Sequence, residues 1–172
     1  GGENGTIAFR KNGLWETVAP LADTSWRDAR AYGREVLLVG DRGMMARGVP
    51  GESWSLIDFP GSTDLMSVCA FEDSIYVGGE NGVLKVLVAG QWLDRSWPAL
   101  QNNGVRSLVR LEDGRLMAWD VFFMSTRVWV RGSEGWRSTG IYLGSVLGHI
   151  QVQGGYAWGI SDFQCRRFDP SV

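Results

Sequence analysis

The chain has 172 residues, of which 44% are hydrophobic, enough to bury a folded core and too many for a disordered protein. Its formal net charge of −2 argues against a nucleic-acid-binding protein, and 2 Cys with 1 His are too few for a zinc site of the usual kind. No apolar stretch is long enough to span a bilayer, and these residues contain no signal-peptide pattern. We therefore expect one folded domain with no metal and no cofactor.

The opening residues of the chain recur near its middle. Residues 1–7 (Gly-Gly-Glu-Asn-Gly-Thr-Ile) are echoed by residues 78–84, and residues 39–45 are a weaker copy. A tryptophan closes each unit with spacings of 39, 38 and 44 residues, at Trp15, Trp54, Trp92 and Trp136. Apolar residues in a second series are spaced by 39, 40 and 41 residues, at Trp26, Leu65, Val105 and Val146. Two markers with one period predict a structural repeat of about 40 residues.

The clearest unit alternates apolar and polar residues with the period of a β-strand. Strands are predicted at residues 65–71, 74–78 and 83–88, and a short outer strand begins at Trp92. The Asn-Gly pair within residues 80–82 predicts a hairpin turn, because both residues tolerate positive φ. Four short antiparallel strands per unit predict an all-β fold, a β-propeller of four-stranded blades.

The repeat divides the chain into about four to five blades. Residues 16–54, 55–92 and 93–136 are three complete blades, residues 1–15 are the last part of another, and residues 137–172 lack the outer strand. The chain is thus expected to be a single propeller domain, 1–172, that starts and stops within a blade. Three interpretations remain open: a piece of a larger ring, a small closed ring, or a ring completed by another chain.

Several segments resemble a known repeat. They are residues 67–73 (Ser-Val-Cys-Ala-Phe-Glu-Asp), 76–79 (Tyr-Val-Gly-Gly), 82–84 (Gly-Val-Leu) and Trp92. This pattern resembles the BNR-type repeat of the superfamily that includes sialidases, Ycf48-like photosystem assembly factors and secreted bacterial repeat proteins, and residues 5–15 are similar to the secreted bacterial type. The sialidase Asp box, Ser-x-Asp-x-Gly-x-Thr-Trp, has no intact copy, which argues against sialidase activity.

One insertion interrupts the repeat. Residues 120–126 stand where other blades have a tight glycine turn, and they include Phe122, Phe123 and Met124. Three large apolar residues in a turn cannot all be buried on one face of a strand. We expect this loop to contact a partner, with a loop folded back over its own blade as the alternative.

Two arginines occupy one repeat position. Arg27 and Arg106 each follow the marker apolar residue of an inner strand, so both can project toward the channel or one rim. A guanidinium presents a planar fork of donors that suits a carboxylate. In the Ycf48-like group a basic patch is implicated in partner binding, which favours a partner-binding role. The alternative is local pairing, for example with Asp28.

Two further tryptophans, Trp119 and Trp158, replace Val39 and Val77 at the ends of second strands. They are either packing residues of wider blades or platforms on which a ligand stacks. The recurring tryptophans, by contrast, are expected to pack between blades.

The most consistent function is a non-catalytic binding or scaffold propeller that engages a protein partner, or a second copy of itself, through one loop face. A lectin-like propeller that binds a glycan through Trp119 and Trp158 is the alternative. A sialidase-type glycosidase is less consistent, because no tyrosine has a catalytic spacing and His149 has no nearby Ser or Cys nucleophile in a recognisable motif. The resemblance to secreted proteins implies an extracellular or periplasmic location.

Overall fold

The computed structural model describes residues 2–100, 103–122, 125–143, 149–153, 156–160 and 165–169. These residues form strands, turns and three short 3-10 helices, η1 (Glu3–Gly5), η2 (Asp41–Gly43) and η3 (Pro98–Leu100). None of the described helices is long and apolar enough to cross a bilayer.

The strands form five antiparallel sheets, each built from consecutive strands. The first sheet is β1 (Ile7–Lys11) and β2 (Leu14–Val18). Blade 1 is β3 (Trp26–Tyr32), β4 (Glu35–Gly40), β5 (Met45–Gly48) and β6 (Trp54–Ile57). Blade 2 is β7 (Leu65–Phe71), β8 (Ser74–Gly79), β9 (Leu84–Val88) and β10 (Gln91–Asp94). Blade 3 is β11 (Gly104–Arg110), β12 (Leu116–Phe122), β13 (Ser125–Gly132) and β14 (Gly135–Leu143). The last sheet is β15 (His149–Gln153), β16 (Tyr156–Ile160) and β17 (Cys165–Phe168).

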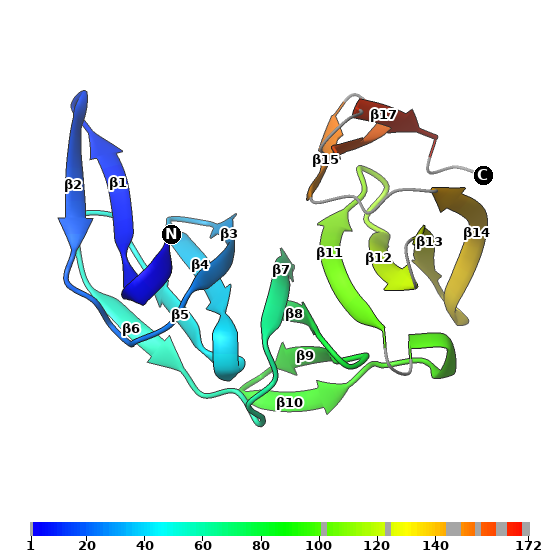
Figure 1. Ribbon diagram of the computed structural model, residues 1–172, viewed down its shortest axis with the longest axis horizontal. Coiled ribbons are helices and arrows are strands. Elements are labelled where there is room, and N and C mark those ends of the chain that lie inside the picture. The colour runs from blue at the N-terminus through cyan, green and yellow to red at the C-terminus, as the bar shows by residue number, and fades with distance from the viewer. Residues whose placement is uncertain are drawn as a thin grey trace.

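The sheets follow one another along an arc (Figure 1). The first strand of each blade, β3, β7 and β11, lies on the inner side of the arc, and the fourth strand, β6, β10 or β14, lies on its outer side. In the described residues β17 pairs only with β16, and the sheet of β1 and β2 lies apart from it. The described strands therefore form a partial ring, and the interpretation of a small closed ring is not supported.

The strands predicted for the clearest repeat unit are confirmed. β7 has the predicted bounds, and the ends of β8 and β9 differ from prediction by one residue. Asn81 and Gly82 have φ values of 55° and 74°, which matches the predicted turn. Arg42 and Gly43 in the weaker copy have nearly the same values, 58° and 74°, so the repeat extends to the backbone conformation.

The blade boundaries differ from the prediction by several residues. The recurring tryptophans stand at or next to the start of the outer strand, as at Trp54 in β6 and Trp92 in β10. Boundaries placed directly after these residues therefore cut the outer strands. The strands continue beyond the tryptophan because the cross-strand ladder to the third strand extends to Ile57 and Asp94.

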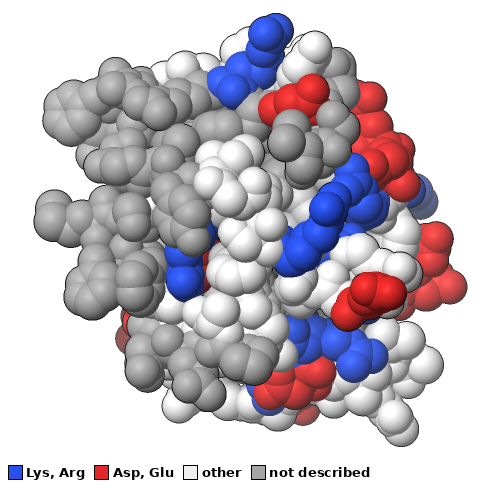
Figure 2. Space-filling view, turned by 90° about the vertical axis from the view of Figure 1, so that its right-hand side faces the viewer, with Lys and Arg blue, Asp and Glu red and all other residues white. Residues whose placement is uncertain are grey.

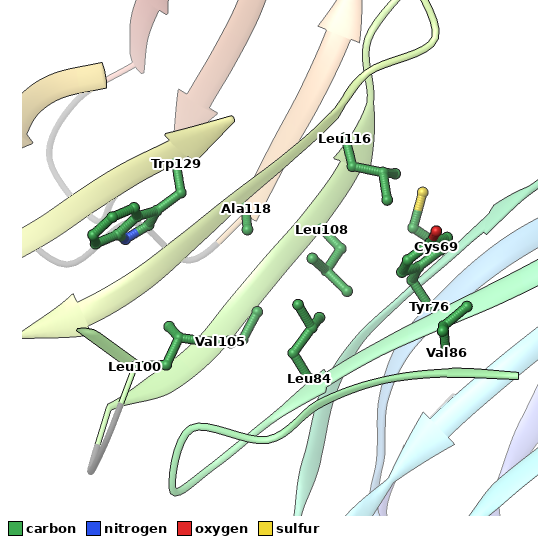
Figure 3. Close-up of a cluster of buried hydrophobic side chains, with 10 residues drawn as sticks. All are labelled: Cys69, Tyr76, Leu84, Val86, Leu100, Val105, Leu108, Leu116, Ala118 and Trp129. Carbon is green, nitrogen blue, oxygen red and sulfur yellow. The ribbon is translucent and has the colours of Figure 1, made fainter. Parts of the chain in front are cut away.

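The core consists of apolar clusters between neighbouring sheets. The cluster in Figure 3 joins blade 2 to blade 3, with Tyr76 and Leu84 on one side and Leu108 and Trp129 on the other. Comparable clusters join blade 1 to blade 2 and blade 3 to the last sheet. Because each sheet buries its faces against its neighbours, the row of sheets is stabilised mainly by contacts between adjacent sheets.

Hydrogen bonds also join adjacent inner strands. The hydroxyl of Ser67 and the amide of Val68 donate to Oδ2 of Asp28 at 3.2 and 3.1 Å, and the amide of Leu108 donates to Oγ of Ser67 at 2.8 Å. Asp28 and Ser67 occupy the same repeat position, two residues after the marker apolar residue. This position therefore connects β3 to β7 and β7 to β11.

Candidate functional site

A β-bulge recurs in the three inner strands of the complete blades. The pairing register shifts between Trp26 and Asp28, between Leu65 and Ser67, and between Val105 and Ser107. The extra residue in each strand is Arg27, Met66 or Arg106. Because a bulge turns a side chain out of the regular alternation of a strand, it can direct that side chain away from the packed faces of the sheets.

The three bulge residues form a row across successive blades. Nη1 of Arg106 lies 3.7 Å from Sδ of Met66, and β3, β7 and β11 pack side by side. About two fifths of each arginine side chain is exposed. The structure thus places Arg27 and Arg106 on one row, as the repeat predicted, and adds Met66 between them.

Acidic residues in the turns between second and third strands contact both arginines. Nε of Arg27 donates to Oδ1 of Asp41 at 2.5 Å, and Nη2 of Arg106 lies 3.9 Å from Oε1 of Glu80. The hydrogen bond to Asp41 raises the pKa of Arg27, and the same bond lowers the pKa of Asp41 below its usual value. Both groups are therefore charged at neutral pH. The pairing predicted as the alternative exists, but with Asp41 and not with Asp28.

These turns dock on the segment that leads into the next blade. The amide of Gly5 donates to Thr24 O at 2.6 Å, and the amide of Gly82 donates to Asn103 O at the same distance. In the turn of blade 1, the amide of Arg42 donates to Oδ1 of Asp64 at 2.8 Å. The turns and the segments before the inner strands therefore share one face of the molecule.

This face contains a polar pocket, which we call the rim pocket, of about 300 Å³. Three carboxylates line it, from Asp23, Asp41 and Asp64, together with Arg42. Arg42 donates to the carbonyl oxygen of Asp23, so this arginine joins the entrance of blade 1 to that of blade 2. The sequence prediction missed Asp41 and Glu80, although both stand at the same place in the repeated turn motif.

The predicted Phe-rich loop is a hairpin with longer strands. β12 continues to Phe122 and β13 begins at Ser125, with Val121 opposite Thr126 and Phe122 opposite Ser125. The prediction of a loop over residues 120–126 was wrong for these strand residues, because the cross-strand ladder continues through them. Phe123 and Met124 lie outside the described residues, as does the side chain of Phe122, so their role as contacts stays a prediction.

A buried ion pair holds this longer hairpin. Asp120 is fully buried, and its carboxylate accepts hydrogen bonds from Nε of Arg127 at 3.0 Å and from Nε1 of Trp129 at 3.2 Å. Nη2 of Arg127 also donates to the carbonyl oxygen of Ala99 at 3.0 Å. The hairpin is thereby tied to the segment between blades 2 and 3.

The two candidate stacking residues have different surroundings. Trp119 is 1% exposed and packs in the cluster with Val128 and Ala157, so its role as a ligand platform is corrected to a core role. Trp158 is 37% exposed in β16. It occupies the position of Trp119 in the last described sheet, and no further sheet in the described chain covers it. Its stacking role stays a prediction.

The arrangement of sheets is similar to that of several solved structures. Virginiamycin B lyase from Staphylococcus aureus superposes with a TM-score of 0.75 at 12% identity, over 98% of this chain and 64% of that chain. The extracellular domain of BT4673, described as a one component system from B. thetaiotaomicron, gives a TM-score of 0.73 at 14% identity. The match covers 96% of this chain and 25% of that chain. Ycf48 bound to D1 peptide superposes with a TM-score of 0.62 at 19% identity, over 98% of this chain and 62% of that chain.

The fold is a partial β-propeller. The chain spans less than two thirds of each of these propeller chains. No protein-family model and no curated protein matches the sequence, so the likeness to Ycf48 is one of structure. These similarities establish the fold and leave the activity to be argued from the site.

Proposed function

We propose that this propeller is a non-catalytic binding module whose rim holds an extended segment of a protein partner. The rim is the row of Arg27, Met66 and Arg106 together with the acidic turn residues Asp41 and Glu80. The observation that carries the proposal is the recurring bulge, which places the exposed side chains of Arg27 and Arg106 and the half-buried side chain of Met66 on one row across three adjacent inner strands.

The chemistry of the row indicates the segment that it would bind. Arg27 uses Nε on Asp41, and in the described part of the chain no acceptor contacts its Nη groups. Nη2 of Arg106 lies 3.9 Å from Glu80, beyond hydrogen-bond length, and its Nη1 meets only the weak acceptor Sδ of Met66, so this guanidinium can still donate to a carboxylate. Met66 between them offers a polarisable apolar surface. A segment with an apolar residue flanked by acidic residues would complement this row.

One of the similar structures supports this proposal. Ycf48 was solved with a D1 peptide bound, so a propeller of this fold can hold a peptide. The extracellular or periplasmic location of this chain stays a prediction. Virginiamycin B lyase shows that the fold also occurs in an enzyme. The broken Asp boxes and the missing catalytic spacings in the sequence favour binding over catalysis here.

The test is a peptide titration with matched arginine variants. Fluorescein-labelled peptides with an acidic–apolar–acidic core are titrated by fluorescence anisotropy against the full chain and against R27Q/R106Q. We expect the double variant to bind about tenfold more weakly or worse, because two charge-assisted contacts are removed. The control is R34Q, which changes an exposed arginine paired with Glu52 away from the row. Equal affinity for R27Q/R106Q and the parent, or equal loss in R34Q, would contradict the proposal.

A second variant tests the predicted contact at the hairpin tip. Phe122→Ser combined with Phe123→Ser should weaken peptide binding and leave the melting temperature nearly unchanged. A large fall in melting temperature would show instead that the two rings belong to the core.

A further inference from the structure

A second pocket lies beside the outer strand of blade 3, and it shares no lining residue with the rim pocket. Its volume is about 520 Å³, within the range of small-molecule sites. It lies between the segment that follows β10 and the turn between β13 and β14. Its walls carry Trp97 and Trp136, whose rings stack with centroids 4.7 Å apart and an interplanar angle of 22°. We call it the tryptophan pocket.

The equivalent tryptophan of blade 2 makes a hydrogen bond and an edge-on ring contact instead. There Nε1 of Trp92 donates to the carbonyl oxygen of Asp58 at 2.7 Å, and the ring of Phe59 meets Trp92 edge-on. Trp136 is the repeat equivalent of Trp92, and Trp97 stands 38 residues after Phe59. In the described chain no acceptor contacts the indole N–H of Trp136. The flat stacking of Trp136 on Trp97 therefore leaves the indole N–H of Trp136 as a donor beside the pocket, whereas the indole N–H of Trp92 in blade 2 is hydrogen-bonded.

The residue opposite the outer-strand tryptophan also differs. It is Gly48 in blade 1, Leu87 in blade 2 and Arg131 in blade 3. Nη1 of Arg131 donates to the hydroxyl of Tyr76 at 2.7 Å, and its guanidinium lies over the Tyr76 ring. Tyr76 thus holds the side chain of Arg131 at the wall of the tryptophan pocket through Nη1. No described residue accepts a hydrogen bond from its Nε or Nη2.

The opposite wall is held by its own hydrogen bonds. The amide of Ser96 donates to Oδ1 of Asp94 at 2.8 Å, the hydroxyl of Ser96 donates to Gly82 O at 2.9 Å, and the amide of Arg95 donates to Leu84 O at 2.9 Å. The side chain of Arg95 is exposed, and no described residue contacts its guanidinium. A site whose walls are fixed before a ligand arrives loses little entropy on binding.

The open groups of the pocket define the ligand. Arg95 and Arg131 supply two guanidiniums for a carboxylate, and the carboxylates of Glu134 and Asp94 supply acceptors for hydroxyl groups. Trp136 supplies an aromatic surface, and it also lines a neighbouring pocket of about 470 Å³ on the other side of the same turn. From the side on which β14 lies, basic and acidic side chains are interspersed around an uncharged area (Figure 2).

We propose that the tryptophan pocket binds a carboxylated monosaccharide, with the sugar ring against Trp136 and the carboxylate between Arg95 and Arg131. A hexuronate has this chemistry: one apolar ring face, one carboxylate and several hydroxyls. The inference does not rest on the proposed peptide site, because none of the five residues of that site lines the tryptophan pocket. Its aromatic platform is Trp136, which is neither of the two tryptophans, Trp119 and Trp158, that the sequence singled out as stacking candidates.

The test is a calorimetric titration of the full chain with sodium galacturonate, neutral galactose and sodium acetate. We expect saturable galacturonate binding with a dissociation constant of about 1 mM, at least roughly tenfold weaker binding of galactose, and none of acetate. No saturation by galacturonate at about 20 mM would overturn the proposal. Equal affinity for galacturonate and acetate would also overturn it, because it would show a site for anions in general.

Matched variants in blades 2 and 3 locate the site. R95Q should weaken galacturonate binding about tenfold, whereas K85Q, which alters the cation near Phe59 in blade 2, should leave it unchanged. Trp136→Phe should weaken binding while Trp92→Phe does not, with melting temperatures reported for both. If Trp136→Phe fails to fold, the exposed R95Q decides. Unchanged affinity in R95Q, or equal losses in R95Q and K85Q, would overturn the proposal.

Discussion

Blades 2 and 3 share one backbone plan but differ where side chains meet the segment between them. Opposite the marker residue, blade 2 has Gly79, and a Cβ there would approach the carbonyl oxygen of Asp64 to 2.6 Å. Blade 3 has Asp120 at this position, buried and paired with Arg127. The comparison shows that the strand pairing repeats faithfully while the contacts to the linking segment are free to change. In blade 3 these contacts differ at two places, the Asp120–Arg127 pair of the hairpin and the tryptophan pocket.

The largest expected effect concerns the ion pair that blade 2 lacks. Asp120→Ala leaves the guanidinium of Arg127 without its buried partner, so the free energy of unfolding should fall by about 3–5 kcal/mol in chemical denaturation. The control is Asp113→Ala, which removes an exposed partner of Arg115 and should cost less than about 1 kcal/mol. Similar losses in both variants would show that the buried pair has no special weight in blade 3.

The next effect concerns the glycine of the turn that docks on the following blade. Gly43 has φ 74°, and a Cβ there would approach the carbonyl oxygen of Gly61 to 2.4 Å. Gly43→Ala should therefore cost about 3 kcal/mol, from backbone strain together with a displaced contact between blades. Gly90 has φ 78° in open space, so Gly90→Ala should cost only about 1 kcal/mol. Equal costs, measured by urea unfolding, would rule out the contact between blades as the reason.

A smaller effect separates the two serines at one repeat position. Ser67→Ala removes the acceptor of the Leu108 amide and should cost about 1–2 kcal/mol in chemical denaturation. Ser107 is also buried, but its hydroxyl has no hydrogen-bond partner among the described residues. Ser107→Ala should therefore be nearly neutral. A larger loss in Ser107→Ala than in Ser67→Ala would contradict the assignment of the connection to Ser67.

The smallest effect is one of thiol chemistry. Burial raises the pKa of Cys69 from 9.0 to about 11, whereas Cys165 is exposed. At pH 8 one thiol of the native chain should react with a disulfide reagent, and two should react in denaturant. A raised thiol pKa means that the folded chain keeps a proton that the unfolded chain loses, so stability should fall slightly between pH 9 and 11. Reaction of both thiols in the native chain would contradict this.

The fold could be predicted from the sequence because each repeat contains local patterns, apolar–polar alternation and turn residues, that indicate its strands and turns. The strand at Leu65–Phe71 follows from alternation, and the turn at Asn81 and Gly82 follows from their tolerance of positive φ. The bulge at Met66 was missed, because Leu65 and Ser67 are two residues apart and both buried, which fits the regular alternation of a strand. One inserted residue of this kind cannot be recognised without the paired strand.

The candidate sites were harder to predict because they depend on segments between the strands. Arg27 and Arg106 were found through their shared repeat position, but their partners Asp41 and Glu80 come from turns whose placement the repeat does not specify. Trp97 could have been found, because Leu21, Phe59 and Trp97 are spaced by 38 residues. The flat stacking of Trp97 on Trp136 has no such signal, since ring orientation depends on the whole wall of the pocket.

The hydrogen bonds between inner strands have a direction. Asp28 accepts from blade 2 and Ser67 accepts from blade 3, so each acceptor precedes its donor in the chain. The turn glycines also contact the segment before the next blade, but as donors: the amide of Gly82 donates to the carbonyl oxygen of Asn103. Ser67 donates to the preceding blade and accepts from the following one. A duplicated copy of this unit inserted into the row would therefore carry both halves of the connection with it.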